Sequence, residues 1–199
     1  MPYADTRGQL AQAFDELTPI ANFAMMIQIH DQVATFSPAE RRSLSQMLDR
    51  TEDFFDANDW YRCGWRWLLR RALNGEPNPV VNRTISHTEL ANSVCVVLSA
   101  ICVCDGEAGM SDYEFLRGWT GLDLGDRSRI PADELNWSEF MAALEILQHA
   151  SPNDQQKLAV AIATTVSGDA LVSPEESVLV QVITQSLNCE ATRLAPDKV

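Results

Sequence analysis

The sequence lacks most of the features that identify an enzyme or a membrane protein. Its longest apolar run, residues 94–104, has eleven residues, which is about half the length of a membrane span. It contains no Gly-x-Ser-x-Gly nucleophile elbow and no glycine-rich phosphate loop, because its nine glycines stand singly or in turns. We therefore expect a soluble, cytoplasmic chain, and nothing in the sequence indicates catalysis.

Cysteine and histidine are also too sparse for a common zinc site. The five cysteines include no Cys-x-x-Cys pair, and their odd number argues against a disulfide framework. Cys95 and Cys102 share a helical face with Leu98, so we interpret them as small buried side chains. We predict no cofactor, and the cysteine usage favours a reducing compartment.

Basic residues are in the minority. The chain carries 28 acidic and 15 basic residues, which gives a formal charge of −13 at pH 7. Such a charge repels phosphate backbones, and no tail rich in lysine or arginine offsets it, so we expect no nucleic acid partner. The hydrophobic content of 46% is nevertheless enough to build a core in a chain of this length.

Apolar residues at helical spacing predict an all-α fold. Leu90, Val94 and Leu98, for example, fall at i, i+4 and i+8, and no segment shows the alternation of a β-strand. Helix starts are marked by hydroxyl residues that precede a proline or a glutamate, at Thr18, Ser37, Ser86, Ser111, Ser151 and Ser173. The pattern predicts about nine helices, at 6–17, 19–35, 38–55, 60–73, 87–104, 112–119, 137–149, 152–167 and 174–187.

Two loops divide the chain into three parts. Residues 74–84 and 121–134 combine proline, glycine and charged residues, as connecting loops do. Neither loop is long or biased enough to be a flexible linker, so we expect the parts to pack as one compact unit. Residues 1–75 form an N-terminal helical half with a first hairpin. Residues 76–135 form a central segment of helix and loops, and residues 136–199 form a C-terminal hairpin half.

The first and last parts contain segments that resemble each other. Residues 37–75 align without a gap on residues 151–189. The two segments share a Ser-Pro start, a break in the middle and an asparagine suited to a helix C-terminus, and their apolar positions agree. We therefore predict two equivalent helical hairpins that pack as pseudo-repeats around one continuous core.

The segment ICVCDGEAGMSDYE, residues 101–114, has the composition of a metal site. A calcium-binding EF-hand loop that began at Asp105 would need glycine at its sixth position and glutamate at its twelfth, where the sequence has Met110 and Leu116. The segment is better explained as a turn between two helices, so we predict no metal site. The weaker alternative is a divalent-cation site formed by Asp105, Glu107 and Asp112.

The segment WYRCGWRWLLRR, residues 60–71, concentrates three tryptophans and four arginines. Arg62, Arg66 and Arg70 repeat at four-residue spacing and form one stripe on a helix. One interpretation is an interface for an acidic protein partner or for a membrane surface, formed by Arg62, Arg66, Arg70, Trp60 and Trp67. The other is that the aromatic side chains build the core, while the arginines neutralise the chain's own carboxylates.

Three segments, read in order, resemble a known protein family. They are FDELTPIANFAMMIQIHDQVATFSPAERRSLSQML, SVCVVLSAICVCDGE and NWSEFMAALEILQHASPNDQQKLAVAIATTVSGDALVSPEESVLVQVI. They are similar to the soluble C-terminal region of bacterial membrane zinc metallopeptidases of the HtpX-like, CAAX-protease-like kind. The segment SGDALVSPEESVLVQVITQSLNC, with a helix, an Asp-Gly-type turn, a capped glutamate and a second apolar helix, resembles the helical module of tellurite-resistance protein B, called TerB-like.

The resemblance implies a non-catalytic accessory region that binds a protein partner or client segment and is associated with a membrane through a parent chain. The His-Glu-x-x-His zinc motif of those peptidases is missing, because the residues four positions after His30, His87 and His149 are Ala34, Ala91 and Asn153. We therefore do not expect this chain to be an enzyme. The TerB-like segment implies an alternative, a free-standing acidic stress-response module that binds divalent metal.

Overall fold

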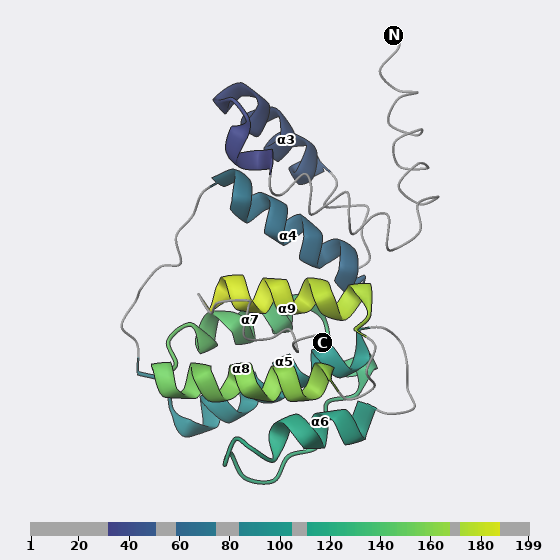
Figure 1. Cartoon of the computed structure of the whole chain (residues 1–199), viewed down its shortest axis with the longest axis vertical. Coiled ribbons are helices and arrows are strands. Elements are labelled where there is room, and N and C mark those ends of the chain that lie inside the picture. Colours follow the sequence, from purple (N-terminus) through teal and green to yellow (C-terminus); the bar gives the residue numbers. More distant parts are fainter. Residues whose placement is uncertain (1–31, 51–58, 75–83, 105–110, 168–171, 188–199) are drawn as a thin grey trace, which may run out of the picture.

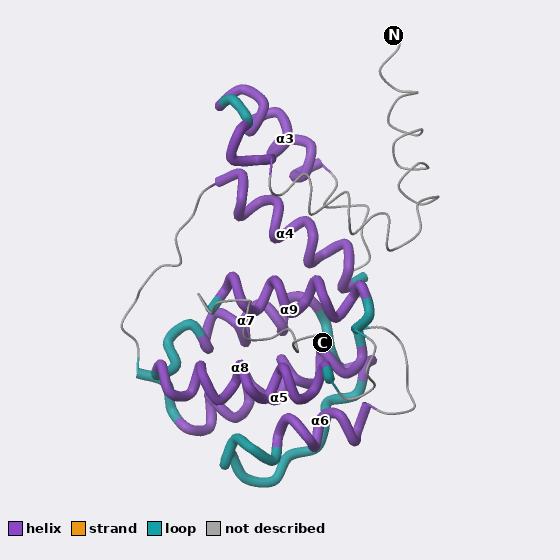
Figure 2. The backbone as a smooth tube through the Cα atoms, viewed as in Figure 1, coloured by secondary structure: helices purple, strands orange, loops and turns teal. Residues whose placement is uncertain are grey.

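The computed structural model describes residues 32–50, 59–74, 84–104, 111–167 and 172–187, and within these ranges the chain contains no β-strand (Figure 1). Figure 2 shows helices joined by loops throughout. In chain order the elements are η1 (Val33–Thr35), α3 (Pro38–Arg50), α4 (Trp60–Asn74), α5 (His87–Val103), α6 (Ser111–Trp119), η3 (Ala132–Glu134), α7 (Trp137–Leu147), α8 (Pro152–Val166) and α9 (Pro174–Ser186). The predicted all-α class is confirmed for this part of the chain.

The predicted helix boundaries agree closely with the observed ones. Seven of the nine predicted helices begin within one residue of an observed start. The predicted helix at 6–17 lies outside the described residues, as does the one at 19–35 except for its last residues, which contain η1. The predicted end of the third helix at residue 55 also lies outside them.

Serine caps explain where several helices begin. At α5 the Glu89 backbone N–H donates to the Ser86 hydroxyl (3.2 Å), and the Ser86 N–H donates to the Glu89 carboxylate (2.9 Å). This capping box satisfies two backbone groups that have no partner inside the helix. The same reciprocal bonds form at α3 between Ser37 and Glu40 and at α9 between Ser173 and Glu176. At α8 the Ser151 hydroxyl accepts from the Asp154 N–H. Thr18 and the side chain of Ser111 lie outside the description.

Helix α5 lies at the centre of the helical body. It packs against α6, α7 and α8, and α9 lies between this group and α4. Helix α3 lies on the far side of α4 (Figure 1). Val97, Leu98 and Ala100 of α5 are completely buried, so this helix supplies the middle of the main core. Each large apolar side chain buried in this way stabilises the fold by about 1.5–3 kcal/mol.

Among the described residues, the buried apolar side chains form two clusters, whereas we predicted a single continuous core. The main cluster joins α4 to α9 and includes Trp65 and Leu68 of α4. In a small second cluster Val33 of η1 is buried with Leu69 and Leu73 of α4, and Leu44 and Leu48 of α3 pack against them. The two clusters exist because α4 has apolar residues on two sides, so that Leu68 points toward α9 while Leu69 points toward α3.

The predicted equivalence of two hairpins is not confirmed. Helix α3 packs directly on α4, as the first hairpin requires. Helix α8 instead packs mainly on α5 and α6, and the main neighbours of α9 are α4, α5 and α7. The matching sequence patterns therefore reflect similar caps and apolar spacing, which helices with different neighbours can share.

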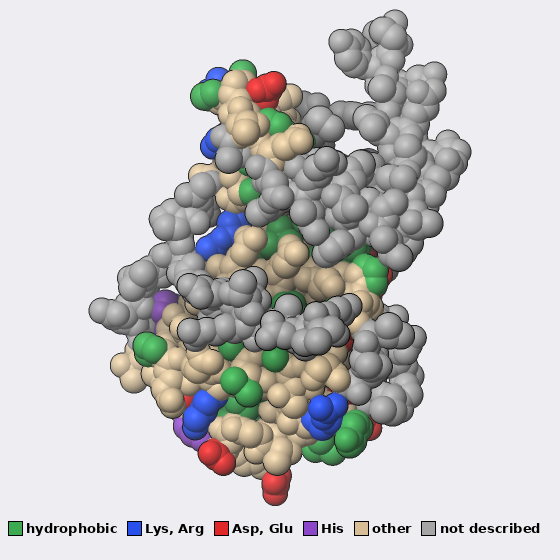
Figure 3. Space-filling view, in the orientation of Figure 1, with side chains coloured by type: hydrophobic (Ala, Val, Ile, Leu, Met, Phe, Trp, Pro, Cys, Tyr) green, Lys and Arg blue, Asp and Glu red, His purple; other side chains and the backbone are tan. Residues whose placement is uncertain are grey.

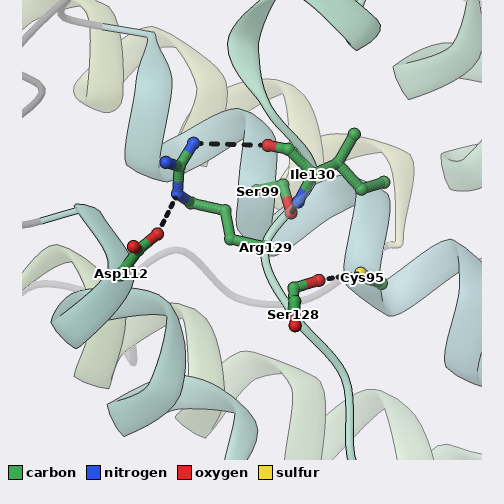
Figure 4. A network of polar contacts seen from close by, with 6 residues as sticks. All are labelled: Cys95, Ser99, Asp112, Ser128, Arg129 and Ile130. Atoms are coloured by element: carbon green, nitrogen blue, oxygen red, sulfur yellow. Dashed lines mark hydrogen bonds and ion pairs between the residues drawn. The ribbon is translucent and has the colours of Figure 1, made fainter.

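The loop after α6 is fixed along α5 by polar contacts (Figure 4). The Ile130 N–H donates to the Ser99 hydroxyl (2.9 Å), and the Cys95 thiol donates to the Ser128 carbonyl (3.5 Å). Ser99 and Cys95 are one helical turn apart on α5, so the loop follows the helix axis. Cys95 and Cys102 are buried, as we predicted.

The same loop contacts both ends of α6, through Asp112 near its start and Trp119 at its end. Arg129 Nε lies 2.8 Å from the Asp112 carboxylate, as Figure 4 shows, and the Trp119 indole N–H donates to the Gly125 carbonyl (2.7 Å). Gly125 has a φ of 79°, a left-handed conformation that glycine adopts without strain. The loop is therefore an ordered part of the body that covers α5 and α6.

Candidate interaction surface on helix α4

Helix α4 begins at an aspartate cap. The Arg62 backbone N–H donates to the Asp59 carboxylate (3.0 Å), which satisfies one of the free N–H groups of the first turn. The Arg62 side chain returns to the same carboxylate, with 3.3 Å between Nε and Oδ2. The first arginine of the predicted stripe therefore contributes to the local structure of the helix start.

One face of α4 is packed closely against α9. Gly64 makes this approach possible, because a Cβ atom at that position would overlap the Val178 side chain and lie 3.6 Å from Val182 Cγ2. Trp65 and Leu68 are almost completely buried beside it. The interpretation that the aromatic and apolar residues of this segment build the core is therefore correct for this face of the helix.

Trp60 belongs to the same buried face. Only 7% of its surface is exposed, and its ring packs edge-on against Phe140 and Trp137 of α7, with centroid distances of 5.7 and 6.2 Å. Trp60, which we predicted as an interaction residue, therefore exposes almost none of its surface, because the aromatic cluster covers it.

The arginine stripe lies on the other side of α4 and is partly engaged within the chain. The side chains of Arg62 and Arg70 are 46% and 38% exposed. Arg70 forms an ion pair with Asp49 of α3, so the stripe runs along the junction of the two helices. Arg66 is half-buried, and its Nε atom has no contact with solvent. The structure thus keeps the stripe together but exposes its two outer members more than its middle one.

Trp67 and Arg71 form a second row beside the stripe. The Arg71 guanidinium lies over the Trp67 ring at 5.2 Å from its centroid, and Trp67 is only partly buried. A cation over an indole ring contributes about 0.5–1 kcal/mol at an exposed site. Sequence reasoning missed Arg71, although its i, i+4 spacing from Trp67 was the available signal. Figure 3 shows a basic patch beside one end of α4.

Tyr61 stands beside the stripe but is not a reactive group. Burial raises the pKa of its phenol above the ordinary value of 10.0. A hydrogen bond with Trp65 lowers the pKa by less, and the negative charges of Glu175 and Asp59 raise it further. The phenol therefore stays protonated at neutral pH and acts as an aromatic packing group, with its ring edge-on to that of Trp65 at 6.4 Å.

The metal alternative is tested only in part. Asp105 and Glu107 lie outside the described residues. Asp112 is exposed and forms its ion pair with Arg129, which occupies the carboxylate that a cation would need. Across the described ranges, no group of three or more His, Cys, Asp or Glu side chains could hold a metal ion.

No family model matches the chain, and neither does a curated protein or a solved structure. The resemblance to the C-terminal region of HtpX-like peptidases therefore stays a prediction. Among the helices that are described, none is both long enough and apolar enough to cross a membrane.

Proposed function

We propose that this chain is a helical interaction domain that binds an acidic protein partner through α4. The observation that carries the proposal is that α4 packs against both α9 and α3 and still presents arginines to solvent. Gly64, Trp65 and Leu68 are fixed against α9, and Leu69 and Leu73 are buried toward α3. The side chains of Arg62 and Arg70 remain partly exposed along the junction with α3. A rigid helix with two partly exposed arginines suits the recognition of carboxylates, which a planar guanidinium can bind through two parallel hydrogen bonds.

The internal ion pairs of the stripe do not prevent such binding. In the pairs Arg62 with Asp59 and Arg70 with Asp49, every side chain is partly exposed. Pairs of this kind contribute about 0.2–1 kcal/mol, so exchanging one carboxylate for that of a partner costs little. Trp67 adds apolar surface beside the stripe, and amphipathic aromatic side chains of this type are common at interfaces.

The proposal includes the finer predictions made from the sequence. The domain would be an accessory region, without catalysis of its own, that relates to the C-terminal part of a membrane metallopeptidase and contains TerB-like hairpins. Its partner would then be a protein or client segment that lies near the membrane. The face of α4 supports only the acidic-partner part of this proposal.

A matched pair of variants tests the proposal. In the first, Arg62→Gln and Arg70→Gln are combined. In the control, Arg117→Gln and Arg127→Gln remove the same charge from the opposite part of the molecule. The probes are a glutamate-rich amphipathic helical peptide, its glutamine counterpart and phosphatidylserine vesicles, and binding is measured by titration calorimetry and by vesicle sedimentation.

We expect the glutamate peptide alone to bind, and the first variant to weaken that binding about tenfold, as the loss of two charged contacts predicts. The control should bind like the wild type, and added salt should weaken binding throughout. Equal losses in the two variants would show that only net charge matters and would refute a site on α4. Binding to vesicles but not to the peptide would replace the protein partner by a membrane surface.

A further inference from the structure

A cavity of about 310 Å³ lies between α5, α8 and the loop after α6. Its walls come from the first turn of α5, the first turns of α8, and residues 122–124. It is separate from α4, none of whose residues line it. Cavities that hold small molecules begin at about 300 Å³, so this one has room for a compact ligand.

Leucine side chains supply an apolar part of the lining, which we call the floor of the cavity. Leu90 of α5 and the loop residues Leu122 and Leu124 provide it, and Leu122 is buried in the main core. The loop that carries the two leucines is held in place by the contact between Trp119 and Gly125. A floor of this kind favours the alkyl part of a ligand, because covering it removes apolar surface from water.

Two carboxylates stand at the rim, Asp123 and Asp154. Asp123 has a φ of 54°, which is a left-handed conformation that few residues other than glycine adopt, and its side chain is 88% exposed. Asp154 accepts a hydrogen bond from the Ser151 hydroxyl (2.7 Å). Asp123 is therefore the carboxylate that projects from the rim, and the backbone conformation holds it there.

Lys157 of α8 lies at the same rim, with its ammonium 4.0 Å from the Asp123 carboxylate. Its side chain combines an aliphatic stem with a terminal ammonium, next to an apolar floor and a carboxylate. The separation is at the limit of an ion pair, and both side chains are well exposed, so the contact is weak. Lys157 thus shows that an alkyl chain with a terminal ammonium fits at this rim, although its own contact with Asp123 is weak.

The geometry points to a binding site for a small primary amine with an alkyl body. Its ammonium would lie at Asp123 and its chain on the leucine floor. The two carboxylates outnumber the one lysine, and the net charge of −13 raises the local concentration of cations. The other polar groups of the lining are His87 and Ser86, and the Ser86 hydroxyl is already engaged by Glu89.

Three probes of equal chain length test this inference on the full chain: hexylammonium, hexanoate and hexanol. Amide NMR at Leu90 and Leu122 reports binding. We expect saturable shifts with hexylammonium and much weaker ones with the other two. Asp123→Asn should weaken binding about two- to fivefold, which is the contribution of an exposed ion pair. Asparagine tolerates the left-handed φ, so the loop should keep its shape.

The Lys157→Met variant is the strongest test, because the inference predicts that its affinity for hexylammonium rises. Methionine keeps the length and helix preference of lysine but removes the competing ammonium, so hexylammonium should bind about two- to fivefold more tightly. Asp126→Asn, in the same loop but outside the lining, is the control and should change nothing. The inference would be overturned if hexanoate bound more tightly than hexylammonium, or if Lys157→Met weakened the binding of hexylammonium. Equal effects of Asp123→Asn and Asp126→Asn on that binding would overturn it too. The absence of saturable shifts would do the same, and circular dichroism confirms that each variant is folded.

Discussion

The close approach of α6 and α8 gives the sharpest prediction about stability. A Cβ atom added at Gly118 of α6 would overlap the Thr165 hydroxyl and lie 2.9 Å from the Ala161 carbonyl oxygen, both on α8. The hydroxyl is itself fixed, because it donates to that same carbonyl (3.0 Å). The backbone oxygen cannot rotate away, so the Gly118→Ala variant has to separate the two helices.

The magnitude follows from two opposing effects. Overpacking a close contact costs about 1–3 kcal/mol, and replacing glycine by alanine inside a helix returns about 0.5–1 kcal/mol. The first effect is larger, so we expect a net loss of about 1–2 kcal/mol, which lowers the Tm by about 2–8 °C in a chain of this size. Differential scanning calorimetry and urea unfolding measure both quantities.

Gly121 provides the matched control, because a Cβ atom there would meet nothing within 4 Å. Gly121→Ala should change the free energy of unfolding by less than about 0.5 kcal/mol. Thr165→Ala combined with Gly118→Ala should cost less than the sum of the two single changes, because the first removes part of the overlap. A Gly118→Ala variant as stable as the Gly121→Ala variant would refute the close contact.

Two further predictions concern metal ions and pH. Calorimetry with calcium, magnesium and zinc should detect no tight binding, and stoichiometric micromolar binding that Asp105→Ala or Glu107→Ala abolishes would revive the metal-binding alternative. Burial raises the pKa of the Cys95 thiol above its ordinary value of 9.0, against smaller lowering effects of Ser99 and Arg127. Because the unfolded chain releases this proton first, the stability contribution is complete below about pH 9 and is lost as the pH rises through the folded-state pKa. Cys95→Ser should therefore flatten the decline of the free energy of unfolding above pH 9, and an unchanged slope would contradict this account.

Much of the fold was predictable because the helix starts are local. Ser86 and Ser173 signal their helices through a glutamate three residues later, and the capping boxes form as expected. Asn136 caps the start of α7 by accepting from the Glu139 N–H (3.0 Å). We had predicted this helix start from the apolar pattern alone and had not recognised Asn136 as its cap. What the sequence could not supply was the choice of neighbours, because amphipathic helices with similar patterns pack equally well on different partners.

The candidate site was predictable only as a helix face. Four-residue spacing was enough to place Arg62, Arg66 and Arg70 on one stripe. Spacing could not separate Trp60, which is buried against Phe140 of α7, from Trp67, which stays partly exposed. That distinction depends on contacts with α7, which lies more than sixty residues further along the chain. The cavity beside Lys157 was missed for the same reason, since three distant segments build it.

The position of α3 determines how a partner could use Arg70. This arginine is paired with Asp49 of α3, so a partner carboxylate would compete with α3 for the same guanidinium. The ion pair contributes about 0.2–1 kcal/mol. In the neighbouring apolar cluster, Leu44 and Leu48 of α3 are partly buried against Val33, Leu69 and Leu73. A fully buried leucine contributes about 1.5–3 kcal/mol, so two half-buried ones together contribute about the same amount. These apolar contacts of α3 are thus stronger than the ion pair, and they hold α3 in place whether or not Arg70 remains with Asp49. A partner carboxylate would therefore bind Arg70 without displacing α3, and we expect the Arg70→Gln change to remove the proposed recognition contact while leaving this part of the fold intact.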